Sequence, residues 1–218
     1  MDAPSLPEGS SGSPVQRRVL WGLLLAVLLA VGFMALMGPR WMREGSPSAE
    51  ELPVFGQIPP FELVNRDGRE VSREDLLGRP WIADFIFTSC RVSCPAMTQR
   101  MASLRTRFPS AQLHLVSVSV DPENDRPEVL EEYAKTYEAQ DRWLFLTGEK
   151  EEIYGLIRDG FKLGVQPAPP EEAASSLEPI THSTRFVLVD AAGRIRGYYD
   201  AFDTAALSRL LQDLRKLL

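Results

Sequence analysis

Two cysteines lie close together in the run TSCRVSCP, and they are the only cysteines in the 218-residue chain. Two are too few for a disulfide scaffold, and a domain of this length does not need one. The three residues between Cys90 and Cys94 allow both sulfurs to face one point. The pair could close a disulfide, exchange disulfides with a partner, or bind a soft metal ion. A structural crosslink would contribute only about 2 kcal/mol, because the ring that it closes is short.

The segments around the cysteines are expected to make them reactive. A buried strand is predicted over Trp81–Phe87, and a helix is predicted from Pro95 to about Phe108. Proline suits the first position of a helix, where its missing N–H would be unpaired anyway. Cys94 is therefore expected immediately before the helix, where unpaired N–H groups and the helix dipole favour the thiolate, and Arg91 adds a positive charge.

The chain has two histidines, and they differ in their setting. His114 lies inside a predicted strand, Leu113–Val120, where ordinary packing is expected. His182 lies where an irregular loop, residues 164–180, enters the next strand, a position at which loops often carry functional groups. Taken alone, it could still be an ordinary histidine. A zinc site using both cysteines and both histidines is an alternative, although this spacing is not that of structural zinc modules. Two thiolates and one imidazole suit copper better, particularly Cu(I).

The N-terminal residues predict a membrane anchor ahead of the folded domain. Residues 1–18 are expected to form a disordered cytoplasmic tail, and residues 38–53 a tether. Between them, residues 19–37 form an uncharged run of 19 residues, about the length that a helix needs to cross ~30 Å of hydrocarbon. A signal peptide is the rival, but its apolar region is usually shorter, and no small-residue cleavage site follows. Two arginines on each side leave the orientation undecided.

Residues 54–218 show the pattern of one α/β domain. A hairpin turn is expected at Asp67-Gly68, a helix start at Ser72 with Asp75, and a closing amphipathic helix over Thr204–Leu218. Further helices are predicted near residues 128–138, capped by Asp121 or Asp125, and near residues 149–159. Strands that alternate with helices predict a mixed sheet flanked by helices on both faces. A strand, a loop with two cysteines and a helix opening with proline together give the layout of a thioredoxin-like domain.

The net charge and the N-terminal residues indicate which partners and which cell compartment to expect for this domain. The net charge of −6 argues against a nucleic-acid surface, which would need a basic face. The N-terminal tail has no Arg-rich amphipathic stretch, so a mitochondrial transit peptide is not expected. We therefore expect a single-pass protein of the bacterial inner membrane; the placement of its domain in the periplasm or outside the cell follows in part from the family resemblance described next.

Several motifs in combination resemble the Sco (SenC-like) family. They are FIFTSCRVSCPAMT, VSVSVDPENDRPEVLEEYA, WLFLTG, and His182-Ser183 leading into a strand that ends in VDAAGR. Members are membrane-tethered, thioredoxin-like copper proteins that assist assembly of cytochrome c oxidase. The resemblance covers about residues 54–218, and it implies that Cys90, Cys94 and His182 bind one copper ion.

The chain departs from the family pattern at two positions. Members often carry Pro where this chain has Arg91, and Asp where it has Thr181. Thr181 cannot supply a carboxylate that orients the neighbouring imidazole, so the copper affinity or the redox potential of the site is expected to be tuned differently. Asp121 resembles a family aspartate and could assist partner docking, or could instead cap the turn DPEN.

Two methionines follow the cysteines, Met97 and Met101. A thioether ligand is conceivable there, but helix packing is the better expectation.

The resemblance predicts a metallochaperone rather than a turnover enzyme. It would receive copper from an upstream donor and deliver it to the copper-site subunit of cytochrome c oxidase. The same cysteines, as a redox-active pair, could also reduce the recipient's cysteines, and the loop 164–180 would let His182 move away for release. The alternatives are a metal-independent thiol–disulfide oxidoreductase, a thiol peroxidase and a redox sensor.

Overall fold

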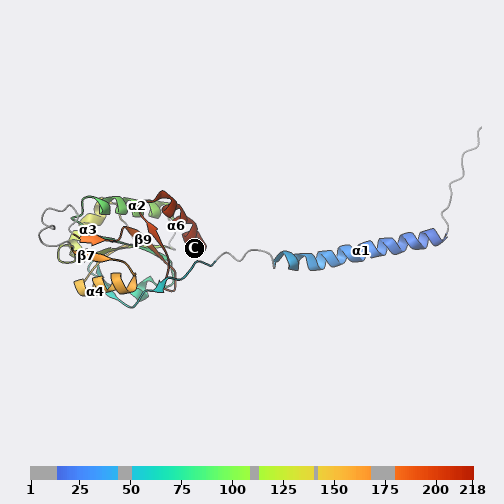
Figure 1. Ribbon diagram of the computed structural model, residues 1–218, viewed down its shortest axis with the longest axis horizontal. Helices are drawn as coiled ribbons and strands as arrows, with labels where there is room; N and C mark the ends of the chain where they lie inside the picture. The colour runs from blue at the N-terminus through green and yellow to red at the C-terminus, as the bar shows by residue number, and fades with distance from the viewer. Residues whose placement is uncertain (1–13, 44–50, 109–112, 140–141, 168–179) are drawn as a thin grey trace, which may run out of the picture. The chain divides into compact units, whose positions relative to one another are not determined.

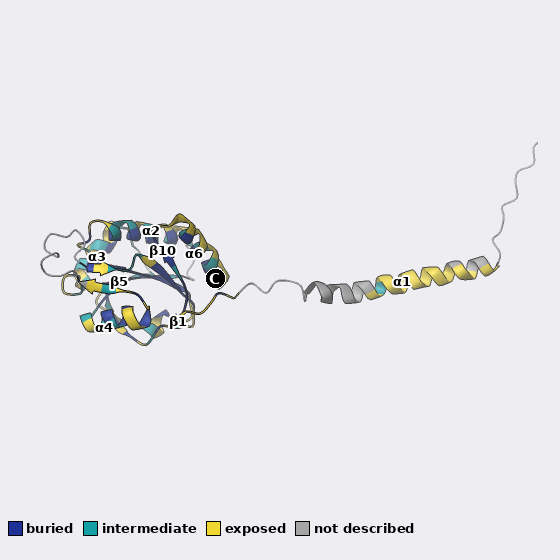
Figure 2. Ribbon diagram, in the orientation of Figure 1, coloured by how far each residue is buried: buried dark blue, intermediate teal, exposed yellow. Residues whose placement is uncertain are grey.

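The computed structural model describes residues 14–43, 51–108, 113–139, 142–167 and 180–218. The chain divides into two compact units, Met1–Glu50 and Glu51–Leu218. The first contains helix α1, Pro14–Arg43, whose described side chains are mostly exposed (Figures 1 and 2). Among the described residues, no helix combines the length and hydropathy needed to cross a membrane. The anchor over residues 19–37 stays a prediction, and so do the tail and the tether, much of which lies outside the described residues.

The second unit is built on an eight-stranded mixed sheet with the order β1-β10-β9-β4-β5-β6-β2-β3. Strand β5 pairs in parallel with both β4 and β6, and the other pairings are antiparallel. The strands are Gly56–Gln57 (β1), Glu62–Asn65 (β2), Glu70–Ser72 (β3), Trp81–Ile86 (β4), His114–Ser119 (β5), Trp143–Thr147 (β6), Arg185–Val189 (β9) and Arg194–Asp200 (β10). A separate two-stranded sheet pairs Val165–Pro167 (β7) with Ile180–His182 (β8).

Helices cover both faces of the large sheet, as the sequence predicts. Figure 1 shows α2 and α6 on one side of the sheet and α4 on the other. The helices of this unit are Arg73–Leu76 (η1), Ser93–Arg107 (α2), Pro127–Thr136 (α3), Lys150–Gly155 (α4), Leu156–Gly160 (η2, a π-helix that continues α4) and Thr204–Leu217 (α6).

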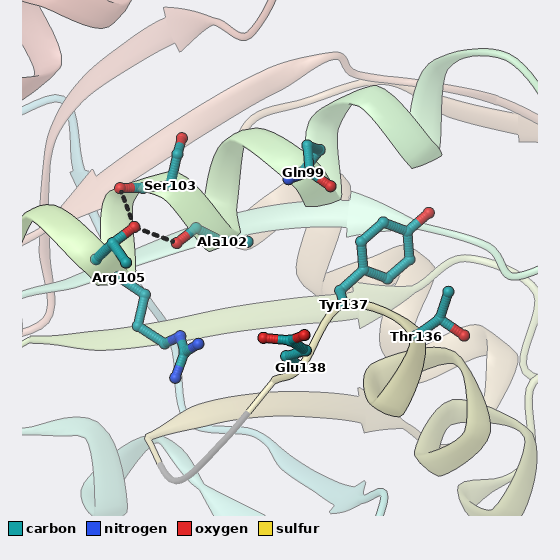
Figure 3. A pocket seen from close by; sticks show the side chains of 8 residues that line it. Gln99, Ala102, Ser103, Arg105, Thr136, Tyr137 and Glu138 are labelled. Atoms are coloured by element: carbon teal, nitrogen blue, oxygen red, sulfur yellow. Dashed lines mark hydrogen bonds between the residues drawn. The ribbon is translucent and has the colours of Figure 1, made fainter.

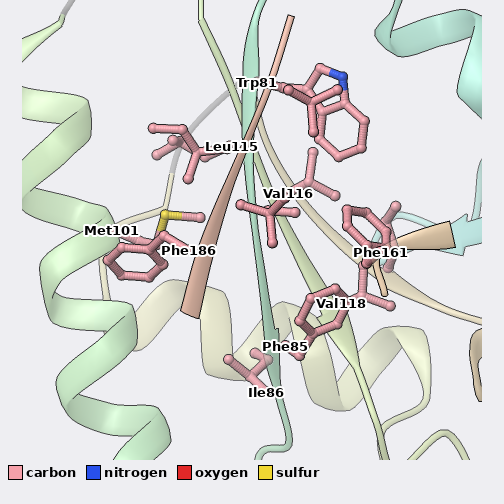
Figure 4. Packing of buried hydrophobic residues seen from close by; sticks show 14 of the residues in the cluster. Trp81, Phe85, Ile86, Met101, Leu115, Val116, Val118, Phe161 and Phe186 are labelled. Carbon is pink, nitrogen blue, oxygen red and sulfur yellow. The ribbon is translucent and has the colours of Figure 1, made fainter. Parts of the chain in front are cut away.

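Strand β4 lies at the centre of the hydrophobic core and leads directly to the cysteines. Every residue of β4 is buried, which fits an apolar run covered by helices on both faces. Phe161 packs edge-on against Trp81 and Phe85, with ring centroids 5.9 Å and 5.0 Å apart (Figure 4). Met97 and Met101 of α2 are fully buried as well, as expected for packing side chains.

The local signals near the start of the domain are confirmed. Gly68 has a φ of +80° in the turn between β2 and β3, a conformation that favours glycine. Ser72 and Asp75 form the predicted capping box, in which the backbone N–H of Ser72 donates to Asp75 Oδ2 at 2.8 Å.

Two boundary predictions are wrong. Helix α2 begins at Ser93, so Cys94 lies in the first turn rather than before it. Pro95 is accommodated there because the first four N–H groups of a helix have no partner within it. Helix α3 is preceded by Arg126 without a side-chain cap, so neither Asp121 nor Asp125 caps it.

The predicted irregular loop, residues 164–180, contains β7 and the start of β8, and its residues 168–179 lie outside the described part of the chain.

Asp190 and Arg196 form a buried ion pair that generates a stability prediction. Arg196 Nη1 lies 2.9 Å from Asp190 Oδ2, and both side chains are 7% exposed. Arg196 also donates to the carbonyl of Leu52. Arg196→Met should lower the free energy of unfolding by about 3 kcal/mol, because it leaves a buried carboxylate short of a partner. Urea denaturation measures this.

The matched control is Arg69→Met, since Arg69 is 81% exposed where it meets Asp67. It should change the free energy of unfolding by less than about 1 kcal/mol. Equal losses for the two variants would contradict the importance of the buried pair.

Candidate metal centre

The three residues predicted to act together, Cys90, Cys94 and His182, lie side by side. Cys90 is in the turn that follows β4, Cys94 is in the first turn of α2, and His182 is the last residue of β8. The Sγ of Cys94 and the Nε2 of His182 are 3.4 Å apart. The backbone N–H of Cys94 donates to the Sγ of Cys90 over 3.3 Å. Residues 88 positions apart in sequence therefore meet at one point.

Both cysteines are reduced and almost enclosed. No disulfide joins these two residues, and their exposed fractions are 4% for Cys90 and 0% for Cys94. The neighbouring Arg91 and Val92 are exposed, so the loop between the sulfurs faces solvent. Of the two cysteines, Cys90 is the slightly more exposed.

The two thiols have opposite pKa shifts. A hydrogen bond from the Cys94 thiol lowers the pKa of Cys90, against the effect of burial, and His182 and Ser93 lower it further. The same hydrogen bond, together with burial, raises the pKa of Cys94. The sequence-based expectation that Cys94 favours the thiolate is therefore wrong. The N–H at the start of α2 points to the Cys90 sulfur, so the negative charge is stabilised on Cys90.

A backbone carbonyl orients the imidazole of His182. Its Nδ1 lies 3.1 Å from the carbonyl oxygen of Ser183, which can only accept a hydrogen bond. In the neutral imidazole the proton is therefore on Nδ1, which leaves a lone pair on Nε2, the nitrogen that faces Cys94. The ring also packs edge-on against Phe87, with centroids 5.6 Å apart. The Ser183 carbonyl thus takes the orienting role that Thr181 cannot fill.

The donor atoms suit a soft ion such as Cu(I): two sulfurs and one neutral imidazole nitrogen. No group of three or more His, Cys, Asp and Glu side chains in the described ranges already encloses a metal-sized space. However, nitrogen and sulfur ligands of one tetrahedral ion, at ~2.0 and ~2.3 Å from it, lie roughly 3.5 Å apart. The observed 3.4 Å between Cys94 and His182 is close to that separation, so these two donors need only small movements to share an ion.

His114 is not part of this centre. It pairs with Trp81 at the start of β4, whereas Cys90 follows the other end of that strand. Burial lowers the pKa of His114, and the nearby charges of Arg79 and Arg142 lower it further. The alternative of a zinc site with both cysteines and both histidines is therefore excluded by the topology.

Asp121 forms the turn after β5. Its backbone carbonyl accepts the N–H groups of Asn124 and Asp125, and its carboxylate accepts the side-chain amide of Asn124. These bonds account for its place in the turn DPEN. A role in partner docking stays a prediction.

The sequence analysis missed the role of Asp125. Its carboxylate is fully buried and accepts hydrogen bonds from Thr88 and Ser119. The only signal in the sequence was that Asp125 is a second aspartate in the run DPEND, where Asp121 already accounts for the turn.

The described pockets lie away from the cysteines. One of about 360 Å³ lies between α2 and the end of α3, where Arg105, Tyr137 and Glu138 line it (Figure 3). None of the pockets described includes Cys90, Cys94 or His182.

Comparisons with known proteins agree with this geometry. Residues 52–218 match the SCO1/SenC family model. A SCO1 homologue of Bacillus subtilis is 34% identical over 167 residues, which cover 75% of this chain and 83% of that protein. A proposed copper-binding protein of Stutzerimonas stutzeri is 33% identical over 153 residues, or 69% of this chain and 72% of that protein.

A solved structure extends the likeness to three dimensions. BsSco, described with a disulfide switch and as a member of the Sco family of cytochrome c oxidase assembly proteins, is 32% identical and superposes with a TM-score of 0.65. The match covers 77% of this chain and 96% of BsSco. The predicted thioredoxin-like fold, a mixed sheet flanked by helices, is confirmed. This chain belongs to the SCO1/SenC family.

Proposed function

We propose that the protein is a metallochaperone that holds one copper ion between Cys90, Cys94 and His182 and passes it to the copper-site subunit of cytochrome c oxidase. The observation that carries the proposal is the contact of the Cys94 sulfur with the unprotonated Nε2 of His182. A relative named as a proposed copper-binding protein and a relative from the family of cytochrome c oxidase assembly proteins support it.

Copper is the cargo of this site, and its binding and release follow from how the donors are held. Both cysteines must be thiolates when they bind the ion, so Cys94 loses its proton on binding. For release, the recipient's donors replace those of the chaperone one at a time. His182 is carried by the small β7–β8 sheet, so it can move away without disturbing the large sheet that holds the cysteines.

The same thiols can reduce a disulfide of the recipient. The Cys90 thiolate attacks one sulfur of that disulfide, which forms a mixed disulfide and releases the other sulfur as a thiolate. Cys94 then gives its proton to Nε2 of His182 and attacks Cys90, which closes the Cys90–Cys94 disulfide and frees the second recipient thiolate. Two electrons pass from the cysteine pair to the recipient.

The N-terminal unit would hold this domain at a membrane. In this proposal residues 19–37 span the bacterial inner membrane, residues 1–18 lie in the cytoplasm, and the domain lies on the other side after the tether of residues 38–53. The support is the uncharged run of 19 residues and the exposure of its large apolar side chains, such as Trp21 and Phe33.

Removing the imidazole should weaken copper binding sharply. His182→Ala is expected to lower Cu(I) affinity by more than about tenfold, since the loss of residues that only orient a ligand already costs ~10–100-fold. Competition with a Cu(I) chelator of known affinity measures it. The matched control is His114→Ala, which should bind as the wild type does. Unchanged affinity in His182→Ala would exclude the three-ligand site and favour the metal-independent oxidoreductase.

Removing one thiol should trap the recipient. With Cys94→Ser the mixed disulfide on Cys90 cannot be resolved, so a covalent complex with the oxidized recipient should accumulate on non-reducing gels. Cys90→Ser should form little complex, because the remaining thiol of Cys94 is 0% exposed and burial by itself raises its pKa. Equal trapping by both variants would contradict the assignment of Cys90 as the nucleophile.

The membrane anchor can be tested with two fusions after Leu218. A reporter that is active only outside the cytoplasm, such as alkaline phosphatase, should be active on the full chain. It should lose its activity when residues 1–43 are deleted. The protein should also remain in washed membranes, whereas the deleted form should not. Activity in the deleted form would show that residues 1–43 are not needed for export.

A further inference from the structure

The carboxylate of Asp125 is buried although its residue belongs to a turn at the surface end of the sheet. The backbone makes this turn without it, since the N–H groups of Asn124 and Asp125 both donate to the carbonyl of Asp121, at 3.1 Å and 2.8 Å. The side chain of Asp125 is 0% exposed. Burying a carboxylate is costly unless hydrogen bonds compensate for the lost water, so its partners identify its role.

The groups that donate to this carboxylate come from two strand ends. Thr88 donates its backbone N–H to Oδ2 at 3.0 Å and its hydroxyl to Oδ1 at 2.5 Å. Ser119 donates its hydroxyl to Oδ2 at 2.6 Å and accepts the N–H of Asp121 at 3.0 Å. Thr88 follows β4, and Ser119 ends β5. The carboxylate therefore ties the turn after β4 to the turn after β5.

The tied turn carries Cys90. Thr88 lies two residues before it, and the backbone N–H of Cys90 donates to the carbonyl of Phe87 at 3.2 Å. On the other side, the Cys90 sulfur accepts the N–H of Cys94 at 3.3 Å. Since Thr88 is held through both its backbone and its hydroxyl, the path from β4 to the sulfur has little freedom left.

From these contacts we infer that Asp125 is a positioning residue for Cys90. It fixes the turn that contains Thr88, so that the Cys90 sulfur keeps accepting the hydrogen bond from the backbone N–H of Cys94 in the first turn of α2. The inference extends the proposed function, because the sulfur held in this way is one of the proposed copper ligands. An amide at position 125 would replace the carboxylate only in part: with its oxygen on the N–H of Thr88, its NH₂ group would face the Thr88 hydroxyl, which would have to change from donor to acceptor.

The test uses four variants of the full chain. Asp125→Asn removes one acceptor, and Thr88→Val removes only the hydroxyl donor. Thr88→Ser keeps both donors and is the conservative rescue. Asp190→Asn is the matched control, because Asp190 is also a buried carboxylate, but it follows Val189, which pairs with Trp81 at the opposite end of β4.

The first measurement does not need copper. Amide hydrogen exchange by NMR should show that Asp125→Asn speeds exchange at the N–H of Cys94 about tenfold relative to Val116 in β5, since the hydrogen bond to the Cys90 sulfur is loosened. Thr88→Val should act in the same direction, and Thr88→Ser should resemble the wild type. Asp190→Asn should leave the ratio unchanged. A ratio that is the same in Thr88→Val as in the wild type would overturn the inference, even if Asp125→Asn failed to fold.

The second measurement connects positioning to metal binding. Cu(I) affinity should fall ~10–100-fold in Asp125→Asn, as expected when a group that orients a ligand is lost, and should stay at the wild-type value in Thr88→Ser. A wild-type chain without copper affinity would overturn the proposed function, whereas the exchange ratio would still decide the role of Asp125. Copper affinity that is equal in the wild type and a folded Asp125→Asn would overturn the inference alone.

Discussion

The hydrogen bond from the backbone N–H of Cys94 to the sulfur of Cys90 connects the chemistry of this protein to its fold. The first N–H groups of a helix have no partner within it, so an acceptor placed there is stabilised. Helix α2 begins one residue before Cys94, which puts this N–H beside the preceding turn. The acceptor is Cys90, and the two thiols consequently differ: the pKa of Cys90 is lowered, and the pKa of Cys94 is raised.

That contact requires a fixed strand as well as a fixed helix. Strand β4 is buried on both faces and paired on both edges, with β5 in parallel and β9 in antiparallel orientation. A strand held in this way has one register, so the position of the turn that follows it is determined. Phe87 continues from this strand and packs against His182, so the core also shapes the third corner of the site.

The residues of the site are attached to two separate sheets. Both cysteines are attached to the large sheet and α2, whereas the histidine is attached to a two-stranded sheet of its own. In the proposed function, this arrangement would let the histidine move while the cysteines stay in place. The orienting partner of His182 is a main-chain carbonyl rather than a carboxylate, which explains how Thr181 is tolerated at the neighbouring position.

The sequence by itself determined the class of fold, most of the strands and helices, and the two reactive cysteines. These features depend on local patterns: alternation of apolar runs, the capping box at Ser72, the glycine turn at Gly68, and the short spacing of the cysteines. The resemblance in scattered motifs added His182. The short strands β1, β7 and β8 were missed, because they are stabilised by their partners rather than by their own residues.

Only the tertiary structure decided which cysteine has the lowered pKa, that His114 lies at the other end of β4, and that Asp125 points inward. Each depends on which groups meet across segments far apart in the chain. The pKa of a thiol and the role of a buried carboxylate are set by neighbours and by exclusion of water, which spacing in a sequence does not specify.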